Sequence, residues 1–111
     1  MKRQLLLFLV LFLSLISVFS RSFISNGINF NITSTVSPYS ISVTSGGVYK
    51  GDIAIPSTVS YNDTVFSVTS VSANTFNGSG ELLSISLPNS IASIGSGAFY
   101  GCTGLLSLIH I

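Results

Sequence analysis

Residues 68–87 read VTSVSANTFNGSGELLSISL, and residues 91–110 read IASIGSGAFYGCTGLLSLIH. A shift of 23 positions places the first stretch on the second without a gap. The shared positions are two landmark pairs, Phe76 with Phe99 and Gly78 with Gly101, and a set of apolar and serine pairs: Val68 with Ile91, Ser70 with Ser93, Val71 with Ile94, Leu82 with Leu105, Leu83 with Leu106, Ser84 with Ser107 and Ile85 with Leu108. A fixed period of roughly 20–50 residues is typical of a solenoid, in which each turn adds a short strand to a sheet.

A weaker copy of the pattern precedes this repeat. Residues 53–59 (IAIPSTV) match residues 85–91 (ISLPNSI) at an offset of 32. The nine extra residues are accounted for by a hairpin, because Asn62-Asp63 separates two short apolar runs and tolerates the positive φ angles of a tight turn. We therefore predict that 53–55, 85–87 and 106–109 are successive rungs of one sheet, with a hairpin inserted after the first.

The remainder of the chain after residue 20 has the period of strands. Residues 28–32 alternate Ile or Phe with Asn, and Tyr39, Ile41 and Val43 alternate with serines. Such alternation indicates half-buried strands, and no stretch has the 3.6-residue period of a helix. We predict a mainly β fold: a β-rich lead-in with a hairpin over residues 21–67, followed over residues 68–111 by the start of a repeat solenoid.

The first twenty residues are typical of a secretory signal peptide. Lys2 and Arg3 precede an almost unbroken apolar run over residues 5–19, and Val18 and Ser20 provide small residues before a cleavage point. A membrane-spanning helix needs about 20 apolar residues, so this run is short for an anchor, which is the alternative interpretation. We predict export to the cell surface or medium, with membrane contact through this segment only.

Charge is scarce in the exported part. Arg21 and Lys50 stand against three carboxylates, which gives a formal net charge of −1. This composition offers no basic surface for nucleic acid, so no nucleic-acid partner is expected. The lone cysteine, Cys102, cannot form an intrachain disulfide and is expected to turn inward as a small apolar residue.

Residues 82–105 (LLSISLPNSIASIGSGAFYGCTGL) resemble the BspA-type leucine-rich repeat. That family has a strand ending in Ile-Pro, then Ser-Val-x-x-Ile-Gly, then Ala-Phe-x-Gly-Cys-x-x-Leu. The resemblance implies a secreted or cell-surface protein that mediates protein binding or adhesion, without catalysis or a cofactor. The first repeat lacks the cysteine, and residues 108–111 (LIHI) stand where Ile-x-Ile-Pro is expected, so the sequence predicts a truncated, uncapped array.

The candidate binding face follows from the strand pattern. Ser84 and Ser86, with their counterparts Ser107 and Ile109, are expected on the exposed side of the ladder, where a protein or surface glycan would bind. No catalytic or metal site is expected, because a single histidine, His110, and three scattered carboxylates cannot assemble one. The alternatives are a structural, wall-associated spacer and a non-functional fragment of a longer repeat protein.

Three Asn-x-Ser/Thr sequons, at Asn31, Asn62 and Asn77, predict N-glycosylation only in a eukaryotic source. In a chain this rich in Asn, Ser and Thr, composition alone also accounts for them.

Overall fold

The computed structural model describes residues 21–47 and 49–110, so the predicted signal peptide lies outside the described residues. In those residues the chain forms strands and turns, and it contains no helix long and apolar enough to span a membrane. The strands are β1 (Ser22–Ser25), β2 (Ile28–Ser34), β3 (Ser40–Val43), β4 (Gly51–Ala54), β5 (Thr58–Tyr61), β6 (Thr64–Val71), β7 (Leu82–Leu87), β8 (Ser93–Ile94) and β9 (Ser107–His110). The mainly β prediction is confirmed.

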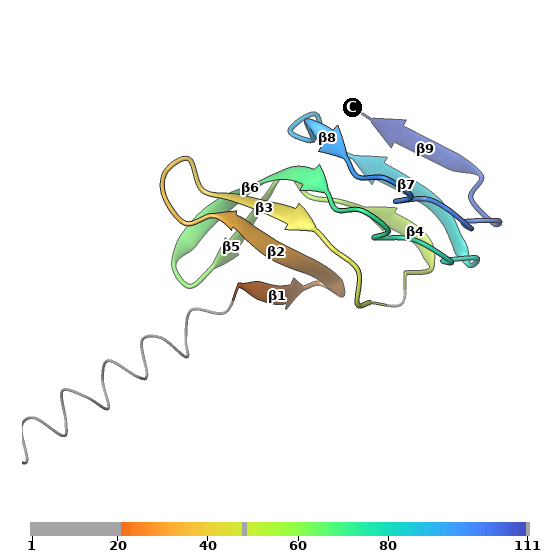
Figure 1. Ribbon diagram of the computed structural model, residues 1–111, viewed down its shortest axis with the longest axis horizontal. Helices are drawn as coiled ribbons and strands as arrows, with labels where there is room; N and C mark the ends of the chain where they lie inside the picture. Colours follow the sequence, from red (N-terminus) through yellow and green to blue (C-terminus); the bar gives the residue numbers. More distant parts are fainter. Residues whose placement is uncertain (1–20, 48, 111) are drawn as a thin grey trace, which may run out of the picture.

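The strands form two sheets that face each other across the core (Figure 1). The first sheet has the order β1-β2-β3-β6-β5, with β8 also paired to β6, and the second has the order β4-β7-β9. Strands β3, β6 and β8 run parallel, as do β4, β7 and β9. From β6 onward the chain alternates between the two sheets, with β6 and β8 in the first and β7 and β9 in the second. One strand from each sheet, with its connections, makes one coil of a solenoid.

The strand register confirms both sequence offsets. Ile85 lies opposite Ile53 on one side and opposite Leu108 on the other, so the three predicted rungs are neighbours in the second sheet. The inserted hairpin is also present, because β5 and β6 are antiparallel with Tyr61 opposite Thr64. Asn62 and Asp63 between them have φ angles of 50° and 59°, the left-handed conformation that a two-residue hairpin turn requires.

The first sheet contains a rung that the sequence comparison did not reveal. Ser42 and Val43 of β3 lie opposite Ser70 and Val71 of β6, at a spacing of 28 residues. The expectation that β3 is half-buried is wrong at Ser42, which is only 3% exposed. Because β3 lies between β2 and β6, neighbouring strands enclose this small side chain, and its Oγ lies 2.7 Å from Ser72 Oγ.

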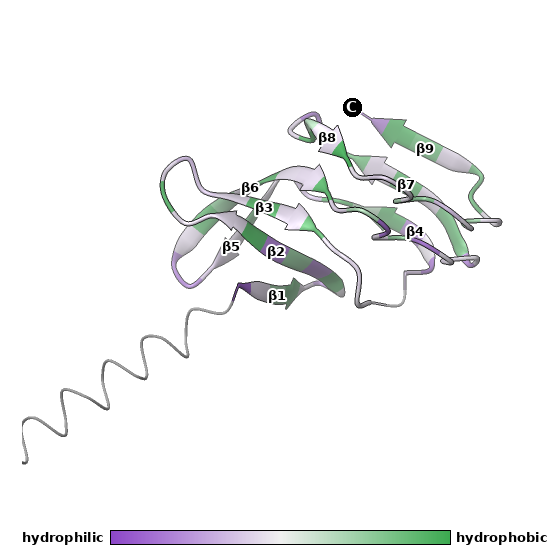
Figure 2. Ribbon diagram, viewed as in Figure 1, coloured by the Kyte–Doolittle hydropathy of each residue, from purple (hydrophilic) through white to green (hydrophobic). Residues whose placement is uncertain are grey.

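One hydrophobic core connects the lead-in to the repeat. Strand β2 confirms the predicted alternation, because Ile28, Phe30 and Ile32 are buried while its asparagines face outward. Figure 2 shows the same mixture of apolar and polar residues along the other strands. The predicted boundary between residues 67 and 68 lies inside β6, so this strand belongs to both parts.

The aromatic residues of successive coils stack inside this core. The Phe76 and Phe99 rings are nearly parallel, with centroids 5.2 Å apart. On the other side, Tyr49 packs edge-on against Phe76 with centroids 4.8 Å apart. Phe76 is completely buried, so it joins the coil before it to the coil after it.

Replacing Phe76 with alanine is therefore expected to lower the free energy of unfolding by about 3–5 kcal/mol, through lost burial and the cavity left behind. Urea unfolding followed by circular dichroism measures the change. Tyr100, an aromatic residue of the next coil that is 74% exposed, gives the control: Tyr100→Ala should stay within about 0.5 kcal/mol of the parent. Equal losses in the two variants would show that the aromatic stack is not formed.

Candidate binding surface

The outer face of the β4-β7-β9 sheet carries two rows of side chains in register. Ser84 lies between Asp52 and Ser107, and Ser86 lies between Ala54 and Ile109. The structure thus brings together the four predicted residues, Ser84, Ser86, Ser107 and Ile109. Sequence reasoning missed Asp52 and Ala54, although the 32-residue offset places them on Ser84 and Ser86.

Asp52 is the charged residue in these two rows. Ser84 Oγ donates a hydrogen bond of 2.6 Å to Asp52 Oδ1, which fixes the acid against the neighbouring strand. Asp52 is exposed, and the other members of the two rows carry hydroxyl groups or apolar side chains. The arrangement presents one anchored negative charge beside neutral hydrogen-bonding groups.

Apolar side chains flank the rows where the strands begin. Leu83 interrupts the pairing of β4 with β7, since Gly51 pairs with Leu82 and the next residue, Asp52, pairs with Ser84. The bulge turns Leu83 outward, where it is 43% exposed. Its counterpart Leu106 is 85% exposed, and the Leu106 amide donates to the Leu83 carbonyl over 2.7 Å. Apolar contact area therefore adjoins the polar rows.

The ionisable residues are dispersed over the described part of the chain. His110 lies exposed at the end of β9, and Asp63 lies at the tip of the β5–β6 hairpin. Residues 21–47 and 49–110 contain no group of three His, Cys, Asp or Glu side chains that could hold a metal ion.

The three sequon asparagines occupy different surroundings. Asn31 lies half-buried in β2, and Asn62 is exposed at the hairpin tip. Asn77 is exposed in a turn, where its Nδ2 donates to Asn74 Oδ1 over 3.3 Å. Glycosylation at these positions stays a prediction.

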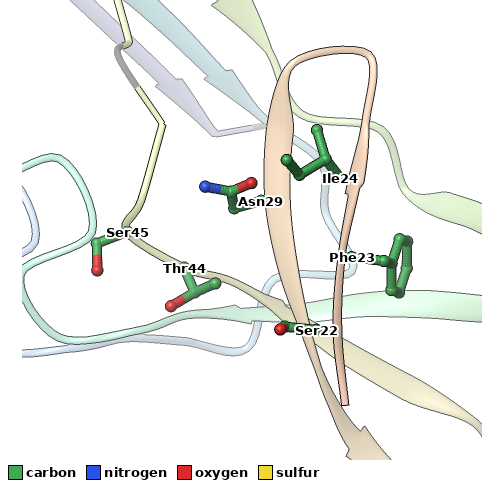
Figure 3. A pocket seen from close by; sticks show the side chains of 6 residues that line it. All are labelled: Ser22, Phe23, Ile24, Asn29, Thr44 and Ser45. Carbon is green, nitrogen blue, oxygen red and sulfur yellow. The ribbon is translucent and has the colours of Figure 1, made fainter. Parts of the chain in front are cut away.

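A hollow of about 480 Å³ lies on the first sheet. Its lining comes from β1, the start of β2 and the segment after β3: Ser22, Phe23, Ile24, Asn29, Thr44 and Ser45. Figure 3 shows the Asn29 amide directed toward Thr44 and Ser45, whereas the Phe23 ring turns to the other side of β1. The sequence analysis did not identify this hollow.

Cys102 packs inward against the core, as the sequence predicts. Its thiol donates to the Phe76 carbonyl with an Sγ–O distance of 3.0 Å. Burial raises the pKa of Cys102 above its ordinary value, and a backbone hydrogen bond from Ser79 offsets part of this effect. The fold therefore favours the protonated thiol, and this contribution to stability is lost as the pH rises through the raised pKa.

Since the thiolate is the reactive form, Cys102 is expected to react with a thiol reagent such as DTNB more slowly in the native protein than in the unfolded chain. The rate measured against pH should also rise at higher pH in the native state. Native and denatured samples that gave the same rate and profile would contradict the partly buried position of the thiol.

The parallel strands and 23-residue coils define a leucine-rich repeat solenoid. Residues 69–110 match the family model described as the BspA type leucine rich repeat region. The sequence resemblance is confirmed.

Solved structures show the same fold. A leucine rich cell surface protein from Faecalibacterium prausnitzii is 22% identical with a TM-score of 0.69, over 83% of this chain and 24% of that protein. A leucine-rich repeat protein from Bacteroides capillosus is 20% identical with a TM-score of 0.66, over 82% and 66% of the two chains. The leucine rich repeat protein of T. pallidum is 27% identical with a TM-score of 0.62, over 78% and 38%.

This chain thus spans about a quarter to two thirds of the length of these three proteins. No curated protein sequence matches it significantly.

Proposed function

We propose that this protein acts outside the cell as a non-catalytic binding module, and that the outer face of β4-β7-β9 contacts a protein partner. The observation that carries the proposal is the alignment of Asp52, Ser84 and Ser107 in one row across three parallel strands. Neighbouring strands lie about 4.8 Å apart, so the partner meets side chains at a fixed spacing on a rigid support. Solenoids in general use such extended faces for binding.

The composition of the face supports a protein partner. Protein interfaces combine apolar contact area with hydrogen-bonding groups at the rim. Here Leu83, Leu106 and Ile109 provide exposed apolar area, and the serines and Asp52 provide hydrogen-bonding groups. Asp52 is already held by Ser84, so little side-chain entropy is lost when a donor from the partner meets it.

The extracellular location and a role in adhesion belong to the same proposal. The predicted signal peptide supports export. The leucine rich protein from F. prausnitzii that shares this fold is a cell surface protein, which agrees with that location. A binding face on an exported protein would contribute to adhesion if its partner were itself attached to a surface.

The test compares two arginine substitutions on opposite sheets. Ser84→Arg places a large cation in the middle of the proposed face, and Ser93→Arg places one at an exposed serine of β8 on the other sheet. Binding of the protein to a panel of purified extracellular matrix and surface proteins is measured by biolayer interferometry. We expect Ser84→Arg to weaken binding about tenfold or more, equivalent to about 1.4 kcal/mol, and Ser93→Arg to leave it nearly unchanged.

Equal effects of the two substitutions would contradict the choice of face. A folded parent protein that bound none of the panel would instead favour a structural spacer.

A further inference from the structure

The hollow on the first sheet is lined by uncharged groups only. Ser22, Thr44 and Ser45 contribute hydroxyl groups, Asn29 an amide and Ile24 an aliphatic side chain, whereas the Phe23 ring points away from the hollow. Because no charged side chain lines it, the hollow has no group that would neutralise an ionic ligand. Its chemistry matches a neutral ligand with many hydroxyl groups.

The geometry of these groups suits a sugar ring. An Asn amide donates through nitrogen and accepts through oxygen, so it can pair with two adjacent hydroxyl groups. Ile24 lies opposite Asn29 in the β1–β2 ladder, and its side chain is 71% exposed on the same side as the amide (Figure 3). An aliphatic surface beside an amide can contact the C–H side of a sugar while the amide binds its hydroxyl groups.

A buried phenol holds the polar residues of the hollow in place. Tyr49 is only 3% exposed. Its hydroxyl group accepts a 3.1 Å hydrogen bond from the backbone N–H of Asn29 and donates a 2.8 Å bond to the backbone carbonyl of Thr44. The Thr44 amide also donates to the Asn29 carbonyl over 2.9 Å. These bonds use the backbone groups and leave the side chains of Asn29 and Thr44 directed outward, so the backbone of the hollow is preorganised.

The segment after β3 approaches the amide closely. A Cβ added to Gly46 would lie 2.7 Å from Asn29 Nδ2, and Gly46 has a φ angle of 121°. Glycine therefore lets the segment pass beside Asn29 without displacing its side chain.

We propose that this hollow is a binding site for a neutral saccharide about the size of a disaccharide, as a terminal unit of a glycan would supply. A volume of about 480 Å³ lies within the range of roughly 300–1,000 Å³ that is common for small-molecule sites. The site lies on the first sheet, whereas the proposed protein-binding face lies on the second, so the two proposals are independent. Asn29 and Thr44 contact the sugar, and Tyr49 is a positioning residue.

The experiment is a titration of the isotope-labelled protein with maltose, lactose, cellobiose and N,N′-diacetylchitobiose, followed by ¹H–¹⁵N NMR. At least one sugar is expected to shift the Asn29 side-chain amide and the Thr44 and Ser45 backbone amides in a saturable manner. Asn29→Ala should weaken binding about tenfold or more, because it removes donor and acceptor together.

The matched control is Asn31→Ala, which alters an asparagine on the same strand and the same outward side of β2 but outside the hollow. It should bind as the parent does. Tyr49→Phe should also weaken binding, since it removes the hydrogen bonds to Asn29 and Thr44, while far-UV circular dichroism stays that of a folded protein.

Three results would overturn the proposal: no saturable shift at the hollow with any of the four sugars, shifts confined to another surface, or equal losses for Asn29→Ala and Asn31→Ala. If Asn29→Ala does not fold, Thr44→Val provides the same test, because it removes one hydroxyl group with little change in volume. Unchanged binding by a folded Thr44→Val would then count against the site.

Discussion

Hydrogen bonds between backbone groups of adjacent coils are the interaction on which the rest of the structure depends. The Ala92 amide donates to Thr69, the Gly95 amide to Val71, and the Phe76 amide to Ala98, with distances of 2.7 to 2.8 Å. Each donor lies 22 to 24 residues from its acceptor, so these bonds exist only if the coils keep one register. They satisfy backbone groups that burial would otherwise leave without a partner.

Close packing of the coils places a second constraint on the sequence. A Cβ on Gly95 would collide with the Ala73 backbone nitrogen, so only glycine lets the two coils meet there. The turns repeat as well: Asn74 and Gly97 have φ angles of 60° and 68°, and both Gly78 and Gly101 have positive φ angles close to 77°. The period is thus set by backbone geometry as well as by buried side chains.

The same register produces the candidate binding surface. Once Ile85 is buried opposite Leu108, the alternation of a strand turns Ser84 and Ser86 outward in line with Ser107 and Ile109. The surface is therefore a consequence of stacking and needs no separate loop. At the other end of the stack, Tyr49 of the preceding coil packs against Phe76. Its hydroxyl group forms hydrogen bonds with the backbone of Asn29 and Thr44 at the hollow.

The second sheet could be predicted from the sequence because its rungs carry long matches. Offsets of 23 and 32 contain landmark Phe, Gly and Pro residues, and both registers are present in the structure. The β3–β6 pairing was missed because its signal is only Ser42-Val43 against Ser70-Val71. Two residues of this kind match often by chance in a serine-rich chain.

The hollow could not be predicted at all. It depends on the β1–β2 pairing, on the path of residues 44–47 and on a buried tyrosine distant in sequence from Asn29. No local pattern encodes that combination. The candidate face, in contrast, was predicted in four residues and extended by Asp52 and Ala54, since those two follow from an offset already visible in the sequence.

Native-state hydrogen exchange, resolved by residue, tests the coil-to-coil bonding most directly. The amides of Phe76, Gly78, Ala92 and Gly95 donate across coils, whereas those of Asn77 and Tyr100 donate within their own turns. We expect the first group to exchange only through cooperative unfolding, and so more slowly than the second. If the cross-coil amides exchanged as fast as the turn amides while the β1–β2 amides stayed protected, the repeat would not form stacked coils.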